Sequence, residues 1–427
     1  MAIRILCTGD VHIGRQPRGL PEALDTRALG PAAAWEAFVR TAIENHVDAA
    51  ALTGDVVDEA NRFFEAYSVL QAGIERLVEA GIAVFAVAGN HDADVLARLA
   101  GQMPQVRLLG RGGQWEEAFL PGADGSPVAR FIGWSFPGRR VAVDPLAGRA
   151  LPARPLPTIG LLHCDADAAG STYGPVTLAQ LKAQPVDAWL LGHIHKPGVL
   201  WAARPLVLYP GSPQGLDPGE RGPHGAWLIT LEPGAEPQAR LIPLAALRWQ
   251  AVDVNLEGVA DKAALDEAIL TGIRGVHERL RADLGPARAV GCRLQLSGRT
   301  KLHRHLDALT QDAADDLRFV QDGVDYFLET IEDHSRADIP LEDVARASDP
   351  AGLLARRLLL LERRSPEEAY RQLLRQGRAA IERAGGEAAF AGLDDDAALT
   401  DQHVEQQLVR AGLWLLEELL AQKEPAP

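Results

Sequence analysis

The sequence contains few cysteines and no long apolar segment. Three cysteines among 427 residues are too few and too scattered for a disulfide framework, and an odd number leaves one unpaired. No run of about 18 apolar residues occurs, and the first residues lack a cationic stretch followed by an apolar one. These absences argue against export and against membrane spanning, so we expect a protein of the cytoplasm.

Basic residues are scarce relative to acidic ones. The chain has 43 lysines and arginines against 58 aspartates and glutamates, which gives a formal net charge of -15 at pH 7. Non-specific affinity for nucleic acid comes mostly from basic side chains that displace counterions. The composition therefore argues against a surface that is basic throughout, but it leaves room for a local basic groove.

The material for folded cores is present in ordinary amounts. Hydrophobic residues make up 47% of the chain and charged residues 24%, which is typical of globular proteins. At roughly 100 to 200 residues per domain, the length predicts two or three domains. We expect a first domain at residues 1–245, a small α/β cap at 246–345 and a helical C-terminal region at 346–427.

Short apolar runs alternate with helical patterns over the first 190 residues, which is typical of βα units that feed a buried sheet. The expected strands are 3–8, 49–53, 82–88, 158–162 and 188–191, and the expected helices are 31–46 and 61–80. Residues 199–254 are rich in strand patterns without a helical window. The fold class is therefore α/β, and we expect the later strands to form a second, more antiparallel layer.

Past residue 245 the pattern changes again. We expect a helix at 261–283, a strand at 289–297 and a further helix at 303–316. Asp349-Pro350 and Ser365-Pro366 are typical helix starts.

A last amphipathic helix is predicted at residues 401–421. Its apolar stripe is expected to consist of Val404, Leu408, Ala411, Leu415 and Leu419. The C-terminal helices either pack on the cap or dock a partner's coiled coil.

Residues that can bind metals follow the ends of five expected strands. The groups are Gly9-Asp10-Val11-His12, Gly54-Asp55-Val56-Val57-Asp58, Gly89-Asn90-His91-Asp92, Leu162-His163-Cys164-Asp165 and Gly192-His193-Ile194-His195. In an open α/β sheet the C-terminal ends of the strands converge on the ligand crevice, so we expect these residues to meet at one point. Carboxylate, carboxamide and imidazole donors suit Mn, Fe or Zn in a two-metal hydrolytic site, and the lack of thiolates disfavours a structural zinc.

Glycine precedes four of these groups, where it permits a sharp turn and keeps side-chain bulk away from the ligands. The alternation in Asp10-Val11-His12 and His193-Ile194-His195 predicts two ligands on one side of an extended segment. The apolar residue between them is then expected to point into the core.

The motifs GDVHIG, GDVVD, GNHD, LLHCD and GHIHKP, in this order, resemble the calcineurin-like metallophosphoesterase superfamily over residues 1 to about 245. The resemblance implies a two-sheet sandwich flanked by helices, with a C-terminal α/β cap and a helical tail. It also implies two divalent metal ions, with Mn expected first and Fe, Zn or Mg as alternatives. Such a pair lowers the pKa of a shared water and generates hydroxide at neutral pH, which attacks the phosphodiester.

The same resemblance assigns roles to individual residues. His91 is expected to protonate the leaving oxygen, and Asp58 to orient His91 by accepting from its ring N–H. Asp55 is expected to bridge the two metals. The implied ligands are Asp10, His12, Asp55 and His195 for one metal, and Asp55, Asn90, His163 and His193 for the other.

Within the superfamily, protein phosphatases are excluded because Asp58 is not followed by Arg-Gly and His91 is not followed by glutamate. The chain is more similar to DNA repair exonucleases of the SbcD type, and to the shorter YhaO-like bacterial relatives, at 54–64 and from 211–215 onward. This implies an exonuclease or endonuclease acting on DNA strands or ends. It also implies an SbcC-type coiled-coil ATPase as partner and dimerisation through the first domain. Better-studied nucleases of the group have a second histidine where this chain has Asp58, so His91 is expected to act alone.

Contacts with DNA are less well specified. Arg15 and Arg18 follow the first metal motif, and Arg139 and Arg140 precede the fourth, so these arginines are candidates to bracket a phosphate backbone. Tyr173 is a candidate to stack on a base. Ordinary solvated loop charges remain the alternative for the arginines. A phosphodiesterase of small nucleotides and a scaffold protein with a vestigial site remain alternatives for the whole chain.

Overall fold

The computed structural model describes residues 2–58, 63–311, 319–363, 368–385 and 400–422. The chain divides into two compact units. The first contains Met1–Ala251, Gly275–Arg293 and Leu317–Thr330, and the second Val252–Arg274, Leu294–Asp316 and Ile331–Pro427. The three-domain division with boundaries at 245 and 345 stays a prediction.

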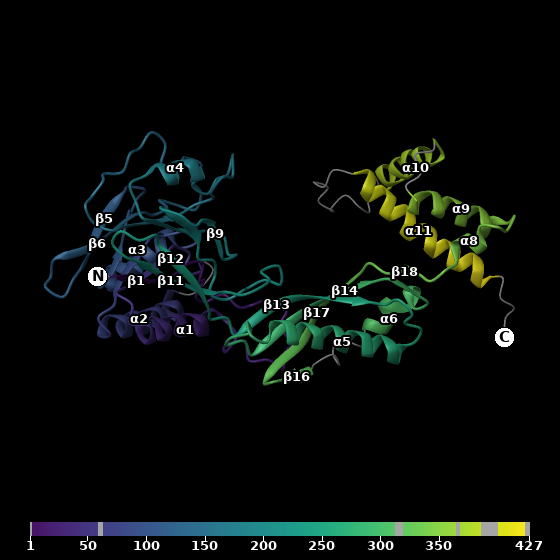
Figure 1. The fold of residues 1–427 in the computed structure, drawn as a ribbon, viewed down its shortest axis with the longest axis horizontal. Coiled ribbons are helices and arrows are strands. Elements are labelled where there is room, and N and C mark those ends of the chain that lie inside the picture. The colour runs from purple at the N-terminus through teal and green to yellow at the C-terminus, as the bar shows by residue number, and fades with distance from the viewer. Residues whose placement is uncertain (1, 59–62, 312–318, 364–367, 386–399, 423–427) are drawn as a thin grey trace. The chain divides into compact units, whose positions relative to one another are not determined.

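The first unit contains two six-stranded sheets (Figure 1). The first sheet has the order β12-β11-β1-β2-β3-β4, in which β1 to β4 are parallel and β11 runs antiparallel to β1. Its strands are β1 (Ile3–Thr8), β2 (Ala49–Leu52), β3 (Ala83–Ala86), β4 (Val106–Leu108), β11 (Gly225–Leu231) and β12 (Gln238–Pro243).

The second sheet has the order β5-β6-β7-β8-β10-β9. The four central strands β6, β7, β8 and β10 are parallel, and the two edge strands are antiparallel to their neighbours. The strands are β5 (Glu116–Pro121), β6 (Pro127–Trp134), β7 (Thr158–His163), β8 (Ala188–Gly192), β9 (Gly198–Trp201) and β10 (Leu206–Tyr209).

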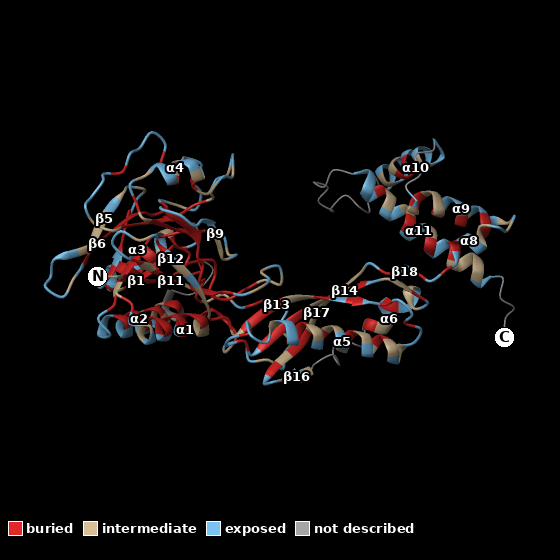
Figure 2. Ribbon diagram, viewed as in Figure 1, coloured by how far each residue is buried: buried red, intermediate tan, exposed pale blue. Residues whose placement is uncertain are grey.

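Alternation along the strands builds a sandwich of these two sheets. In β1, Ile5 belongs to the core between the sheets, where Phe85 and Phe131 stack with ring centroids 3.8 Å apart, whereas Leu6 faces the helices. The central strands β1, β2, β7, β8 and β10 are accordingly buried on both faces (Figure 2), whereas the edge strands β5, β9 and β12 are partly exposed. Helices α1 (Pro31–Glu44), α2 (Phe63–Glu79) and α3 (Ala93–Gln102) pack on the first sheet, and α4 (Leu178–Ala183) packs on the second. The predicted fold class, a two-sheet α/β sandwich flanked by helices, is confirmed.

The expectation that residues 199–254 form a separate antiparallel layer is wrong. Strands β9 and β10 join the second sheet, β11 and β12 join the first, and β13 (Leu247–Asn255) belongs to a third. A local hydrophobic pattern identifies a strand, but the strands that pair with it depend on contacts with residues far away in the sequence. The pairing of β11 with β1 is an example. Helix α3 and strands β4 to β6 were not predicted, and residues 61–62 of the expected second helix lie outside the described residues.

The third sheet has the order β13-β14-β17-β16. Helix α5 (Lys262–Leu280) and strand β14 (Ala289–Ser297) lie where the sequence predicts them, and α6 (Leu306–Gln311) follows the short turn η1 (His303–His305). The remaining residues of the helix expected at 303–316 lie outside the described ones. The other strands are β16 (Phe319–Gln321), β17 (Val324–Asp333) and the pair β15 (Arg299–Thr300) and β18 (Arg336–Ala337).

The C-terminal region consists of helices around an apolar cluster. They are α8 (Leu341–Val344), α9 (Pro350–Glu362), α10 (Glu368–Gly385) and α11 (Asp401–Ala421). The Asp349 carboxylate accepts a hydrogen bond from the Gly352 N–H at 2.8 Å, so it caps α9 as the sequence predicts. The start predicted at Ser365-Pro366 lies outside the described residues. In the described part of the chain we find no helix whose length and apolarity would let it span a bilayer.

The stripe predicted for α11 is wrong at Ala411 and Leu415, which are exposed, whereas Leu408 and Leu419 pack against the apolar cluster as predicted. Val404 is buried, but Leu415 is 46% exposed, and the buried residues farther along are Val409, Leu413 and Leu416. Leucines occupy both faces of this helix, so the 3.6-residue period fits more than one stripe. Packing against α9, where a Cβ on Gly412 would meet Leu358 at 2.7 Å, selects the other face.

Candidate metal centre

The predicted ligands all follow the C-terminal ends of parallel strands. Asp10 and His12 follow β1, Asp55 follows β2, Asn90 follows β3, His163 ends β7, and His193 and His195 follow β8. Three overlapping groups have ligand atoms that lie within 4.8 Å of one another. The groups are Asp10, His12 and His195; Asp10, Asp55 and His163; and His12, Asp58 and His91.

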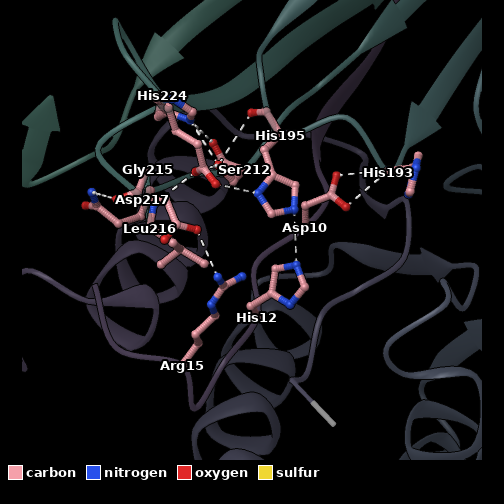
Figure 3. Close-up of polar contacts among 12 residues, drawn as sticks. Asp10, His12, Arg15, His193, His195, Ser212, Gly215, Leu216, Asp217 and His224 are labelled. Carbon is pink, nitrogen blue, oxygen red and sulfur yellow. Dashed lines mark hydrogen bonds and ion pairs between the residues drawn. The ribbon is translucent and has the colours of Figure 1, made fainter. Parts of the chain in front are cut away.

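The first group has two imidazoles that face each other. His12 Nε2 lies 3.3 Å from His195 Nε2, beside the Asp10 carboxylate (Figure 3). Two nitrogen ligands about 2.1 Å from one cation, at angles between about 90° and 109°, are separated by about 3.0 to 3.4 Å. The separation therefore matches two ligands of one metal ion.

The second group converges on His163. Its Nε2 lies 3.0 Å from Asn90 Oδ1 and 3.5 Å from Asp55 Oδ2, while its Nδ1 lies 2.9 Å from the Thr53 carbonyl oxygen. Because a carbonyl only accepts, Nδ1 carries the proton and Nε2 keeps its lone pair for a metal. Asp10 belongs to both groups, whereas the sequence assigns the bridge to Asp55. The bridging role of Asp55 stays a prediction.

His193 contacts the other candidate ligands through both its main chain and its ring. Its backbone N–H donates to the Asp10 carboxylate, with oxygens at 3.1 and 3.2 Å. Its ring lies 5.4 Å from the His163 ring and stacks on Tyr173 at 4.7 Å and 29°. The ring thus adjoins the second group, in agreement with its predicted neighbours, and Tyr173 covers one of its faces.

His91 and Asp58 lie beside the first group. The His91 backbone N–H donates to Asp55 Oδ1 at 2.8 Å, and the His91 ring meets the His12 ring edge-on at 5.0 Å. Asp58 Oδ2 lies 3.4 Å from His12 Nδ1. Asp58 is therefore in contact with His12 as well as near His91, and its orienting role toward His91 stays a prediction.

The buried carboxylates are compensated by imidazoles. Asp10 is fully buried and Asp55 is 2% exposed, and in the described part of the chain neither pairs with lysine or arginine. Burial raises the pKa of Asp10. Burial acts in the same direction on Asp55, but His163 and His12 outweigh it and lower the pKa of Asp55. Two buried carboxylates without a permanent cation nearby are expensive, so the donor set fits bound divalent metal ions.

The histidines differ in their protonation. Burial and the nearby His163 lower the pKa of His193 to about 4, and burial also lowers the pKa of His91. Burial acts against the charged form of His195 as well, but a hydrogen bond to Glu220 and the charge of Asp10 raise its pKa to about 9. Nearby acidic groups therefore favour positive charge at His195, where a proton and a metal ion would compete.

Backbone strain is concentrated at the site. Asp10, His12 and Asp55 have φ of 49°, 50° and 50°, and His193 has φ of 99°, a region that L-residues rarely adopt. The expectation of extended ligand segments is therefore wrong for both motifs. Val11 does point into the core, but Ile194 is 37% exposed. Left-handed turns let adjacent donors reach one point in a way that alternation alone does not predict.

Glycines next to these turns leave room for the ligand side chains. A Cβ on Gly54 would lie 2.5 Å from His163 Nδ1, and one on Gly192 would lie 2.6 Å from the same atom. Any side chain at either position would push His163 away. The predicted reason for glycine before the ligand groups is confirmed at these two positions.

Two acidic residues near the site, Glu220 and Asp217, were missed by the sequence prediction, and a third, Asp92, was named in a metal motif without a role. Asp92 is buried and accepts from the Gly89 and Val56 N–H groups, both at 2.7 Å, and burial raises its pKa to about 7. Glu220 accepts from His195, and Asp217 pairs with Arg15. Glu220 and Asp217 lie in the turn-rich stretch 211–224, whose glycines and prolines indicated only a loop.

The predicted DNA-contacting arginines lie in loops at the same end of the sheets. Arg15 donates to Asp217 Oδ2 at 2.9 Å and is 25% exposed, and Arg18 is 76% exposed (Figure 3). Arg139 and Arg140 are exposed just before Val141, which bridges to Tyr173. Since Tyr173 stacks on His193, both arginine pairs adjoin segments that carry candidate ligands.

The comparisons with known families agree with this geometry. The family model described as "Calcineurin-like phosphoesterase" matches residues 3–197. The chain carries a calcineurin-like metallophosphoesterase domain. The model described as "Metallophosphoesterase YhaO, middle domain" matches residues 249–336. The predicted superfamily and the YhaO-like relationship are therefore confirmed.

Relatives of the phosphoesterase domain include named nuclease proteins. The uncharacterized metallophosphoesterase YhaO of Bacillus subtilis is 29% identical, over 66% of this chain and 70% of that protein. A component of the SbcCD nuclease of Rhodobacter capsulatus is 27% identical, over 57% of this chain and 69% of that protein. The DNA double-strand break repair protein Mre11 of Haloferax volcanii is 29% identical, over 65% of this chain but only 58% of its own length.

Proposed function

We propose that this chain is a two-metal phosphodiesterase that cleaves DNA, as an exonuclease or as an endonuclease on single strands. The observation that carries the proposal is the meeting of His12, His195 and Asp10 at one centre and of Asp55, His163 and Asn90 at a second. That the relatives are named as part of a nuclease and as a double-strand break repair protein supports DNA as the substrate.

Two divalent cations would supply a nucleophile at neutral pH and would neutralise charge on the phosphate. Mn²⁺ is our first choice because oxygen and imidazole donors suit it, with Fe, Zn or Mg as alternatives. The residues proposed to hold the cations are Asp10, His12, Asp55, Asn90, His163, His193 and His195.

His91 is proposed to donate a proton to the leaving oxygen. Its backbone is fixed by the bond to Asp55, while its side chain is partly open to solvent. Asp58, which lies within the same group, is proposed to keep the neighbouring imidazoles in orientation through its carboxylate. His91 would therefore act on the proton of the leaving oxygen, and Asp58 on the orientation of His91 and of the proposed ligand His12.

Arginines are proposed to position the DNA strand. Asp217 holds Arg15 beside the first metal motif, so one guanidinium edge is fixed and the remainder can meet a phosphate. Arg18, Arg139 and Arg140 would extend the contact along the backbone of the strand.

Two protein partners are proposed from the resemblance. A coiled-coil ATPase of the SbcC type would bind the C-terminal helices, where Trp414 is 55% exposed and Leu415 is 46% exposed. A second copy of the chain would bind through the first domain. Neither contact is needed for the chemistry of the site itself.

The proposal is tested by digestion of end-labelled single- and double-stranded DNA with Mn²⁺, with a cyclic dinucleotide as the alternative substrate. We expect the DNA to be cleaved, and the His91→Ala protein to be slower by about 10² to 10⁴, as for loss of a general acid. His403→Ala, which removes an exposed imidazole at the start of α11, is the matched control and should cleave at the normal rate. Cleavage of the dinucleotide alone would overturn the DNA assignment in favour of a small-nucleotide phosphodiesterase.

A further inference from the structure

His163 and His195 each belong to one of the two metal groups, and their rings are oriented by different hydrogen-bond acceptors. His163 Nδ1 donates to the Thr53 main-chain carbonyl at 2.9 Å, whereas His195 Nδ1 lies 2.8 Å from Glu220 Oε1. A carbonyl fixes the tautomer only, but a carboxylate also raises the basicity of the ring. The two metal groups therefore differ in the acceptor that orients their histidine, a main-chain carbonyl for His163 and a carboxylate for His195.

Glu220 is itself held in place. Its Oε2 accepts from the Leu216 N–H at 2.9 Å and lies 3.4 Å from Ser212 Oγ, and its side chain is 16% exposed. Its backbone N–H donates to the Asp217 carbonyl at 2.8 Å. The loop thus satisfies one carboxylate oxygen and leaves the other, Oε1, for His195 (Figure 3 shows the His195 ring next to Ser212 of this loop).

The two carboxylate oxygens of Glu220 have different partners, and this distinguishes two possible roles for the residue, an anchor of the loop and a support for His195. An anchor of the loop would need only Oε2 and its contacts with Leu216 and Ser212. Oε1 contributes nothing to the loop, since its hydrogen bond goes to a ring on the segment after β8. That ring directs Nε2 at His12 Nε2, 3.3 Å away.

We propose that Glu220 is a positioning residue, which holds His195 with its proton on Nδ1 and aims Nε2 at the cation of the first group. The inference rests on the proposed function, because it assumes that a divalent cation binds between His12 and His195. Loss of a carboxylate that supports a histidine ligand commonly weakens metal binding by about 10- to 100-fold. The weakening should be confined to one of two sites.

The test is calorimetric titration of the full-length chain with Mn²⁺, in the absence of substrate. Glu220→Ala should weaken one of the two binding events by about 10- to 100-fold and leave the other unchanged, and Glu220→Asp should restore part of the loss. Glu116→Ala is the matched control, because the Glu116 carboxylate accepts a backbone N–H from Gly110 at 3.0 Å and, among the residues that the structure describes, has no hydrogen bond or ion pair with a histidine. This control should titrate as the unaltered chain does.

A second readout separates positioning from damage to the fold. Excess Mn²⁺ should restore the rate of Glu220→Ala on a small phosphodiester, because only occupancy of one site has fallen. Equal Mn²⁺ affinity in Glu220→Ala and the unaltered chain would overturn the inference while leaving the proposed function intact. Loss of both binding events without rescue by metal would also overturn it, in favour of a loop anchor. Normal metal binding without any DNA cleavage would instead count against the proposed function alone.

Discussion

The phosphoesterase domain buries charged side chains beside its apolar core, whereas the buried cluster of the C-terminal helices is apolar. In the phosphoesterase domain, Asp10, His12 and His163 are fully buried, and Asp10 lies close to each of the two histidines. In the helices after Pro340 the buried cluster is apolar, and a tryptophan and two leucines of α9 and α11 stay on the surface. Burying a charged group costs free energy unless it is paired or binds a metal ion, and exposed apolar side chains that lie together often mark a contact surface. The comparison suggests that the first region is built for chemistry and the second for contact.

The largest expected effect lies in the phosphoesterase domain. Asp55→Asn removes a charge from a buried carboxylate that accepts from the His91 N–H and faces His163. We expect hydrolysis of a small phosphodiester to fall by about 10³, because several kcal/mol of charge stabilisation are lost and each tenfold in rate is about 1.36 kcal/mol. Initial rates in saturating Mn²⁺ measure this. If Asp55→Asn retained more than a tenth of the rate, the buried carboxylate would not be needed for catalysis, and the proposed difference between the two regions would be contradicted.

A smaller effect is expected from the core of the C-terminal helices. Leu413→Ala empties a fully buried position and should destabilise the helices by about 2 to 5 kcal/mol. Hydrogen exchange of α9 and α11 measures this, and hydrolysis of the small phosphodiester should stay unchanged.

Leu415→Ala is the matched control on the same helix, because Leu415 is 46% exposed. It should change stability by no more than about 0.5 kcal/mol. A larger loss of stability in Leu415→Ala than in Leu413→Ala would mean that this part of α11 packs through Leu415, as the sequence predicts, instead.

The smallest effect is expected at a helix end. Asp349→Ala removes the side chain that accepts from the Gly352 N–H and should cost about 1 kcal/mol. Exchange rates in the first turn of α9 should rise more than those in α11. Faster exchange in the phosphoesterase domain would show that the two regions are not energetically separate.

Residues with strong local signals could be predicted from the sequence. Strand β1, the metal motifs after β1 and β8, and the cap of α9 depend on neighbouring residues, and each lies where the pattern predicts it. Glu220 could not be predicted, because its partner His195 is 25 residues away and strands β9 and β10 lie between them in the sequence. The buried face of α11 was missed because leucines on both faces satisfy the same period. Both features depend on contacts between segments that are distant in the sequence, and the local sequence pattern does not encode such contacts.

The account depends on a pair of cations gathered by donors from both sheets. Anomalous diffraction from crystals grown with Mn²⁺ tests this directly. The account predicts two peaks, one between His12 and His195 and one beside His163 and Asn90, with a carboxylate shared between them. A map with no peak at these side chains, or with His163 turned away from Asp55, would contradict it.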